Sequence, residues 1–346
     1  MNSTVENVEK ELKQGKLRSL YLFYGEEQFL LEQCVKKIRH LFGECIKGIN
    51  DIAIDETNVN ELISDIETPS FGYEKKLILV KNTGLFKKEG RKKGTELQKL
   101  KEKVATYLQE NQAMIEQSVV LVFVEEEAEK QALYKVIEKN GLVCSFDYQK
   151  PNILIKRLQG ISEAYKVTID GSTAQYLLEC AGTNMQDLVN EIRKLIEYAG
   201  SGGTITKESI DQLTTKKLES VIFDLTDNLG KRNLAEALVV FHNLVREKEP
   251  LPKILITLYH HFKKLYQTTL AVNYGEDVVQ CLNLKPNQSF LVNKYKMQAR
   301  YFQEAELRSI LQDLIDLDAQ FKSGQMDLQI GLETIFCHYC GKKITG

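Results

Sequence analysis

The loop after the first apolar run holds the residues that could, by their position, meet a nucleotide. Residues 20–24 (LYLFY) indicate a buried strand, and Gly25, Glu26 and Glu27 follow it. A loop that cradles phosphates needs several glycines, a lysine for the β and γ phosphates, and a Ser or Thr for magnesium. This loop has one glycine and two carboxylates, and the carboxylates would repel a phosphate. The sequence therefore predicts a degenerate nucleotide site.

A second candidate for chemistry is the acidic pair Glu125-Glu126, which follows the apolar residues 119–124 (VVLVFV). Two carboxylates after a strand could hold magnesium and supply a catalytic base in a nucleotide hydrolase. They could equally mark a solvated helix N-terminus, where negative charge is favourable. The second interpretation is the more economical one, because no phosphate-binding loop accompanies the pair.

Histidines and cysteines offer little further chemistry. His260 and His261 are adjacent, so on a helix they point in different directions, which is poor geometry for shared metal ligation and favours packing or surface roles. Cys337-His338-Tyr339-Cys340 resembles one half of a zinc site, but the sequence has no second half. No Gly-x-Ser-x-Gly elbow occurs. We therefore expect no catalytic residue, no metal site and no cofactor.

A lysine-rich segment, residues 86–103, is a candidate for contact with nucleic acid. It carries eight Lys plus Arg against three Glu, so it could bind phosphates with release of counterions. The candidate DNA-facing residues are Lys87, Lys88, Arg91, Lys92 and Lys93. The alternative is a solvated loop and an exposed helix face, and no aromatic residues are interleaved for base stacking.

The elements that must position these residues alternate between short and long apolar patterns. Apolar runs of four to six residues lie at 20–24, 49–54, 77–80, 119–124 and 142–146, and residues at helical spacing separate them. Strands joined by helical crossovers require a parallel sheet that is covered on both faces. Residues 1–150 are therefore predicted to form an α/β domain.

After Pro151 the strand pattern stops, and the apolar spacing is helical almost to the end of the chain. Breaks at residues 181–182 and 200–203 separate three expected helices. Prolines 250, 252 and 286 interrupt a longer helical region that starts near residue 217. We therefore expect a small helical domain at 151–216 and a second all-α domain at 217–346.

Composition restricts the class of protein. The chain has 346 residues, with 46 Lys plus Arg against 48 Asp plus Glu, so any contact with nucleic acid must come from a local basic patch. The first residues are polar and acidic, unlike a secretory signal, and no apolar stretch approaches the length of a membrane span. Seven scattered cysteines are typical of reduced thiols. We expect a cytoplasmic protein without membrane contact.

Several stretches carry a resemblance to a known family. They are YLFYGEEQFLLEQCVKKIR at 21–39, ETPSFGYEKKLILVKN at 67–82, VFVEEEAEKQALYKVIEKNG at 122–141 and ECAGTNMQDLVNEIRKLIEYAG at 179–200. In this order they resemble the delta subunits of bacterial DNA polymerase III clamp loaders, AAA+ family members that do not themselves bind nucleotide. The resemblance implies an AAA+-like α/β parallel-sheet domain, a small helical lid domain and an all-α collar domain that serves in oligomerisation.

The resemblance also bears on the lid. In nucleotide-binding relatives the lid carries an arginine for the γ-phosphate within a Gly-x-Asp-Met/Leu-Arg pattern. The corresponding residues here run from Gly182 to Gln186, and Gln186 cannot supply that charge. Gln186 therefore joins Gly25, Glu26 and Glu27 in the degenerate nucleotide site.

In this family, an apolar pair on an exposed turn of the first domain docks into a pocket on the sliding clamp. The matching residues here are Ser70, Phe71, Gly72 and Tyr73. Many relatives have two adjacent large apolar residues, whereas Ser70 and Gly72 flank Phe71, so Tyr73 is the expected substitute for the second anchor. The alternative, from the residues alone, is that Phe71 closes the preceding helix against its own core.

The function implied by the resemblance is that of a non-catalytic subunit of the polymerase holoenzyme, a nucleotidyltransferase complex. The implied partners are the beta sliding clamp, the gamma or tau ATPase subunits, delta-prime, and primed DNA through the assembled complex. Two alternatives remain from the residues: a degenerate P-loop ATPase or helicase-loader-like enzyme, and a stand-alone DNA-binding adaptor that uses the lysine-rich segment.

Overall fold

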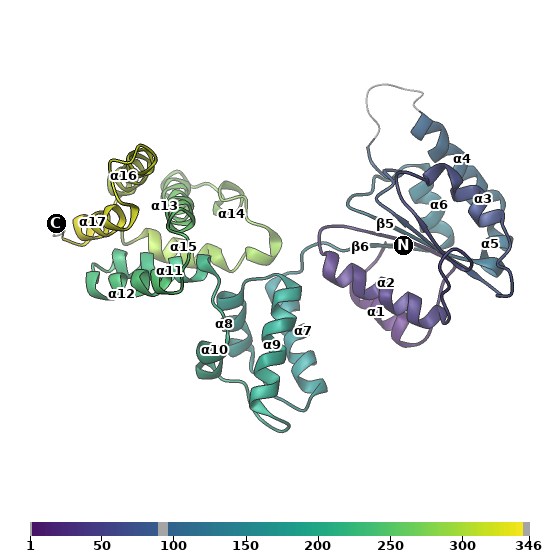
Figure 1. Ribbon diagram of the computed structural model, residues 1–346, viewed down its shortest axis with the longest axis horizontal. Coiled ribbons are helices and arrows are strands. Elements are labelled where there is room, and N and C mark those ends of the chain that lie inside the picture. The colour runs from purple at the N-terminus through teal and green to yellow at the C-terminus, as the bar shows by residue number, and fades with distance from the viewer. Residues whose placement is uncertain (1, 89–95, 342–346) are drawn as a thin grey trace. The chain divides into compact units, whose positions relative to one another are not determined.

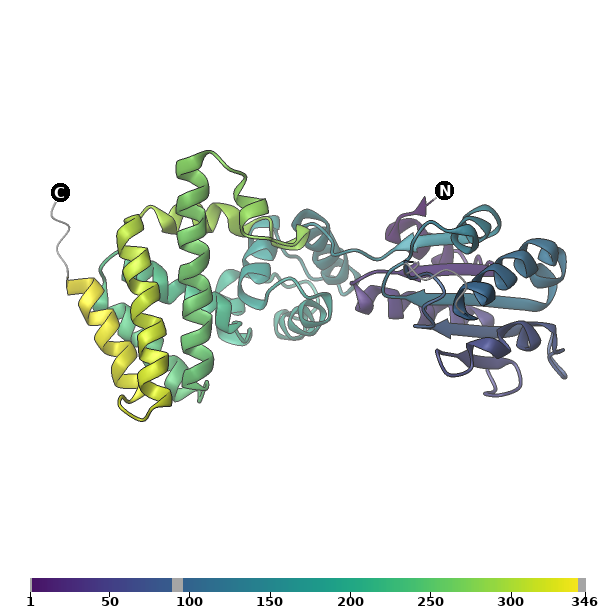
Figure 2. The same cartoon turned by 90° about the horizontal axis from the view of Figure 1, so that it is seen from above.

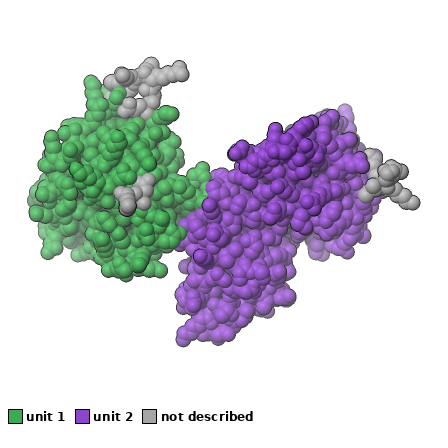
Figure 3. Space-filling view, turned by 180° about the vertical axis from the view of Figure 1, so that it is seen from behind, with its two compact units in different colours: residues 1–148 green, residues 149–346 purple. Residues whose placement is uncertain are grey.

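The computed structural model describes residues 2–88 and 96–341. The chain divides into two compact units, residues 1–148 and 149–346, which Figure 3 shows in different colours. Among the described residues, the first unit holds the six strands, and the regular elements of the second unit are helices joined by loops.

A fully parallel sheet forms the centre of unit 1 (Figures 1 and 2). Its six strands are arranged in the order β1-β6-β2-β5-β4-β3. Their bounds are β1 Asn2–Ser3, β2 Leu20–Tyr24, β3 Asp51–Ile54, β4 Lys76–Lys81, β5 Val119–Glu125 and β6 Leu142–Ser145. Alternate residues of β2 point to opposite faces: Leu20 and Leu22 join one core cluster, whereas Tyr21 and Phe23 are buried on the other side.

Helices cover both faces of this sheet, as a parallel sheet requires. Figure 1 shows α1 (Val5–Lys13) and α2 (Gln28–Phe42) on one face. The other face is covered by α3 (Leu62–Glu67) with the preceding 3-10 turn η1 (Val59–Glu61), and by α4 (Glu96–Glu110), α5 (Gln112–Ser118) and α6 (Ala132–Asn140). The core between the sheet and α3 to α6 includes Phe86 and Phe123, whose rings meet edge to face.

Unit 2 begins with four helices: α7 (Pro151–Ala164), α8 (Gly171–Ala181), α9 (Met185–Ala199) and α10 (Lys207–Leu213). A larger set follows: α11 (Leu218–Gly230), α12 (Leu234–Arg246), α13 (Leu251–Tyr274), α14 (Val278–Cys281), η2 (Pro286–Gln288), α15 (Leu291–Ala299), α16 (Glu304–Lys322) and α17 (Leu328–Gly341). One continuous hydrophobic core joins this second set.

Polar contacts connect the two sets of helices within unit 2. The Lys217 amide donates to the Cys180 carbonyl at 2.9 Å, and the Lys217 amine pairs with Asp187 at 2.7 Å. Lys294 pairs with Glu179 at 2.6 Å. Residues 149–346 form a single compact unit, and the predicted division at 216/217 lies inside it.

The α/β class with a parallel sheet, followed by helices, is confirmed. The described part of the lysine-rich segment, residues 86–88 and 96–103, is mostly exposed, as expected of a solvated loop end and an exposed helix face. Phe86 is nevertheless a core residue, and Lys101 is buried on α4, where its amine donates to the Lys87 carbonyl at 2.8 Å. One expectation needs correction. The expected strand at 49–54 starts only at Asp51, since the Ile49 side chain is exposed in a turn.

The structure also shows elements that the apolar pattern did not indicate. Strand β1 consists of two polar residues paired in parallel with β6, and α1 and α17 were not predicted. Among the helices in the described ranges, none is both long enough and apolar enough to cross a bilayer.

Candidate functional site

The turn between α3 and β4 presents an aromatic ring to solvent. Helix α3 ends at Glu67 because Thr68 precedes Pro69, and the residue before a proline is disfavoured in the α conformation. Phe71 follows and is 78% exposed. Gly72 has φ +81°, a conformation that L side chains rarely adopt, so it lets the chain turn sharply behind the ring. The alternative in which Phe71 closes the helix against its own core is therefore wrong.

Hydrogen bonds between Ser70 and Tyr73 close this turn. The Tyr73 amide donates to the Ser70 carbonyl at 3.1 Å, and the Ser70 hydroxyl donates to the Tyr73 carbonyl at 2.7 Å. The side chains of both residues are half-buried. Of the four predicted clamp-binding residues, Phe71 is the large apolar one exposed at the tip, and Ser70 and Tyr73 brace the turn.

Beneath the turn lies a charged side chain for which no role was predicted. Lys76 is the first residue of β4 and is 3% exposed. Its amine donates to the Asp65 carbonyl at 2.8 Å and to the Thr68 carbonyl at 2.6 Å. Burial lowers the pKa of Lys76, and the nearby Asp65 carboxylate opposes that shift. A lysine directly before four apolar strand residues, and seven residues after a proline, is the signal that could have found it.

Backbone amides of the loop after β2 are hydrogen-bonded to carbonyls of the protein itself. The Gly25 amide donates to the Glu125 carbonyl at 3.3 Å, and the Glu27 amide donates to the Phe146 carbonyl at 2.8 Å. A Cβ on Gly25 would lie 2.5 Å from the Phe146 carbonyl oxygen, so this loop packs directly on the backbone after β6. A phosphate cradle needs free amides pointing at the ligand. Here two of those amides already have protein acceptors.

The acidic pair after β5 is divided between interior and solvent. Glu125 is 1% exposed and accepts hydrogen bonds from the Thr83 amide at 2.9 Å and the Thr83 hydroxyl at 2.7 Å. Burial raises the pKa of Glu125, and these hydrogen bonds oppose the rise. Glu126 is exposed, and the next helix begins only at Ala132. The expected solvated helix N-terminus is therefore corrected: Glu125 ends a buried strand and ties it to the loop after β4.

In unit 2, Gln186 lies in the first turn of α9 and is exposed. Its side-chain amide donates to the Asn190 side chain at 3.1 Å. Asn184 caps the start of this helix, and its side chain accepts a hydrogen bond from the Asp187 amide. Gln186 is thus a solvated helix residue without charge.

Of the candidate DNA-facing residues, Lys87 and Lys88 are exposed. Arg91, Lys92 and Lys93 lie outside the described residues. The Lys87 carbonyl also accepts a hydrogen bond from the Gln131 side chain at 3.4 Å, so the start of the segment is held by α4 and by the residue before α6.

The two adjacent histidines have the packing and surface roles that were expected. His260 is exposed, whereas His261 is buried and its Nε2 lies 2.9 Å from both the Thr226 hydroxyl and the Gln298 side-chain oxygen. Cys337 and Cys340 lie on α17. Among residues 2–88 and 96–341, no group of three or more His, Cys, Asp or Glu is arranged to hold a metal ion.

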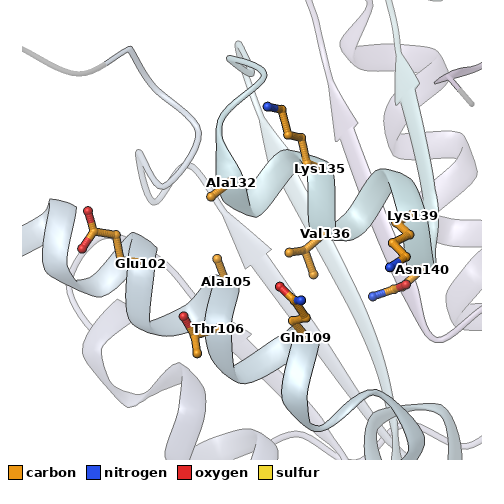
Figure 4. A pocket seen from close by; sticks show the side chains of 9 residues that line it. All are labelled: Glu102, Ala105, Thr106, Gln109, Ala132, Lys135, Val136, Lys139 and Asn140. Atoms are coloured by element: carbon orange, nitrogen blue, oxygen red, sulfur yellow. The ribbon is translucent and has the colours of Figure 1, made fainter.

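A hollow of about 380 Å³ lies between α4 and α6 (Figure 4). Ala105, Ala132 and Val136 contribute apolar surface to it, and Lys135 and Lys139 contribute amines. No residue with a predicted role lines this hollow.

Two family models match the chain. Residues 21–147 match the model described as DNA polymerase III, delta subunit, and residues 219–339 match the model of the DNA polymerase III delta subunit, C-terminal domain. Together they include the loop after β2, the Phe71 turn and the larger helical set of unit 2.

Individual proteins show the same similarity over nearly the whole chain. A DNA polymerase III subunit delta from Bacillus subtilis is 27% identical over 332 residues, which cover 95% of each chain. A probable DNA polymerase III subunit delta from Aquifex aeolicus is 26% identical over 87% of this chain and 85% of that protein. The solved structure of the Bacillus subtilis DNA clamp loader delta protein has a TM-score of 0.75 at 26% identity, and covers 98% of this chain and 100% of that one.

Proposed function

Because the chain belongs to the DNA polymerase III delta subunit family, we propose that it grips the sliding clamp of the replication machinery through Phe71. Its role lies in clamp loading, as a subunit of the DNA polymerase III complex. The observation that carries the proposal is the 78% exposure of Phe71 on a closed turn. An exposed aromatic ring on a braced turn is the kind of anchor that fills a pocket on a partner.

The mechanism proposed for the clamp is a shift between two populations. A ligand favours the open ring only to the extent that it binds the open form better than the closed form. The Phe71 turn would supply the grip, and the subunit would hold one interface of the ring open for loading onto primed DNA. ATP would act in the neighbouring gamma or tau subunits.

The subunit itself is proposed to bind no nucleotide and to have no catalytic site. Support comes from the loop after β2, where the Gly25 and Glu27 amides have protein acceptors and two carboxylates stand where phosphate would bind. Gln186 adds no positive charge from the lid side. These features weigh against the alternative of a degenerate P-loop ATPase or helicase-loader-like enzyme.

The assignment of roles along the chain follows the proposed domains. Residues 1–150 would contact the clamp, residues 151–216 would form the lid, and residues 217–346 would form the collar that assembles with gamma or tau and delta-prime. Primed DNA would be reached through the assembled complex, in the cytoplasm. A direct role of Lys87 and Lys88 in DNA contact remains the second candidate, favoured by their exposure.

The test is the affinity of the chain for the sliding clamp from the same source, measured by surface plasmon resonance. Burying a phenylalanine contributes roughly 1.5 to 3 kcal/mol, and about 1.4 kcal/mol is tenfold in affinity. Phe71→Ala should therefore weaken binding by about ten- to a hundredfold. Tyr73→Ala should give a smaller loss, because its ring is half-buried.

Tyr274→Ala is the matched control, because Tyr274 is 76% exposed but lies at the end of α13 in unit 2. It should leave clamp affinity unchanged. Thermal melts of all three variants separate lost binding from lost folding. Equal affinities for the Phe71→Ala and unmodified chains would remove Phe71 from the clamp contact and with it the proposed grip.

A further inference from the structure

The buried amine of Lys76 occupies the place where a backbone donor is missing. In an α-helix the carbonyl of residue 65 would accept from the amide of residue 69. Residue 69 is Pro69, which has no N–H. The Lys76 amine donates to the Asp65 carbonyl at 2.8 Å instead. Its second bond, at 2.6 Å, goes to the carbonyl of Thr68, the residue directly before the proline.

The lysine that makes these bonds starts from a rigid element. Strand β4 is an inner strand, paired with β5 on one side and β3 on the other, and Lys76 itself lies opposite Val119 of β5. The Leu77 amide donates to the Asn50 carbonyl at 2.7 Å, so the start of β4 is held on the β3 side as well. The amine thus connects the sheet to the chain that leads into the Phe71 turn.

Buried lysines are rare, and the position of Lys76 is one that favours its positive charge. Lysines are almost never fully buried unless they are paired, because removing the charge from water is unfavourable. The carbonyl end of a helix carries partial negative charge and favours a cation within its last turn. The Lys76 amine lies at that end of α3 and donates to its carbonyls. An apolar side chain at the start of β4 could not make these hydrogen bonds.

We propose that Lys76 is the positioning residue for Phe71: it caps the end of α3 and holds residues 68–73 in the shape in which the ring is presented. The inference rests on the proposed clamp contact and explains why the Phe71 ring is held in position. A turn that is already ordered before binding avoids the entropy loss of being ordered during it. Loss of the amine should therefore weaken binding although Lys76 is itself buried beneath the turn.

The experiment replaces Lys76 by methionine, which keeps an unbranched apolar stem and removes the donors. Lys75→Met is the matched control, because the Lys75 amine donates to the Glu116 carbonyl at 2.8 Å, away from the turn. Lys76→Met should weaken clamp binding by about tenfold, the scale of one loosened anchor. Lys75→Met should stay within about twofold, since exposed surface substitutions act weakly.

A double-mutant cycle separates positioning from a general loss of structure. If Lys76 acts through the ring, Lys76→Met should have no further effect on affinity in a Phe71→Ala chain. An equal loss in both backgrounds would overturn the proposal. Unchanged binding of Phe71→Ala would instead remove the clamp contact itself, so the two failures are distinguishable.

Two further readouts follow the turn directly. Amide hydrogen exchange at Tyr73 should accelerate in Lys76→Met and not in Lys75→Met, because the turn would open more often. Adding Pro69→Ala to Lys76→Met restores an N–H for the Asp65 carbonyl and should recover part of the affinity. A Lys76→Met chain that unfolds as a whole, with no recovery from Pro69→Ala, would assign Lys76 to the stability of unit 1 and overturn the proposal.

Discussion

Two side chains of unit 1 reverse the usual relation between polarity and burial. Phe71, a large apolar residue, is 78% exposed, and Lys76, a cation, is 3% exposed. Each arrangement is unfavourable for the isolated chain. They lie five residues apart, Phe71 on the turn and Lys76 at the start of β4, and the inward charge holds the chain that presents the outward ring. The exposure of the Phe71 ring is explained if a binding partner covers it.

A third unusual residue is His261 in unit 2. Burial lowers the pKa of His261 to about 4, the nearby Lys264 charge adds to this effect, and the Gln298 hydrogen bond opposes it. Its Nε2 also lies within hydrogen-bonding distance of Thr226 on α11. The imidazole is therefore a neutral polar link between α11, α13 and α15.

His261 predicts an acid sensitivity for this unit. The unfolded chain binds a proton at His261 below about pH 6.5, whereas the folded chain does so only below about pH 4. Between these values acid favours the unfolded state, so stability falls as the pH is lowered. The loss should reach about 2 kcal/mol between pH 7 and pH 5.

Urea denaturation of the unmodified chain and of His261→Gln at both pH values measures this effect. Carboxylates that titrate in the same range contribute to both chains, so the difference between the chains isolates the histidine. A variant that loses as much stability between pH 7 and pH 5 as the unmodified chain would contradict the assignment.

At the level of elements, the sheet was the most predictable part. Residues 20–24 and 119–124 are apolar at nearly every position because a parallel strand is buried on both faces, and that pattern needs no tertiary information. Strand β1 could not be found in this way. Its two polar residues are a strand only because β6 provides a partner more than 130 residues later.

Long-range contacts also decided two features that were not predicted from the sequence. Phe86 stands beside lysines in the sequence, and its burial depends on the ring of Phe123. Lys76 looks like an exposed strand end until Pro69 is seen to leave the Asp65 carbonyl without a backbone donor. The family resemblance predicted that Phe71 lies on the turn. Its exposure could not be predicted from the residues alone, because it depends on which residues the folded core buries.

The loop between β2 and α2 leads to a testable prediction at the level of elements. Because its amides are bonded within the protein and its carboxylates oppose anions, isothermal titration with Mg-ATP should show no saturable binding at micromolar concentrations. A nucleotide-binding clamp-loader ATPase subunit in the same buffer is the positive control. Saturable heat from the isolated chain would mean that the loop rearranges around phosphate.

At the scale of the whole molecule, the sheet, the Phe71 turn and the loop after β2 all lie within residues 1–148, the unit that is coloured green in Figure 3. That length is typical of a domain that folds alone. The larger helical set of unit 2 keeps apolar side chains exposed, among them Val272, Met297 and Ile330. Such surface is available for assembly with other subunits.

The fragment of residues 1–148 should therefore unfold cooperatively on heating and bind the clamp with an affinity within about threefold of the full chain. It should not elute together with the ATPase subunits on gel filtration, whereas the full chain should. Phe71→Ala in the fragment provides the negative control for clamp binding. A folded fragment that fails to bind a clamp bound by the full chain would show that unit 2 contributes to the grip.

The pairing of β1 and β2 with β6 has a consequence for synthesis on the ribosome. Tyr21 of β2 lies between Val122 of β5 and Leu142 of β6 in the sheet. Strand β2 is the second to be synthesised, and it cannot pair until β5 and β6 have been made. Contacts this distant in sequence slow folding and leave early segments open to wrong partners. A nascent chain shorter than about 145 residues has no complete sheet to fold into, and unit 1 should form in one late step once β6 has left the exit tunnel.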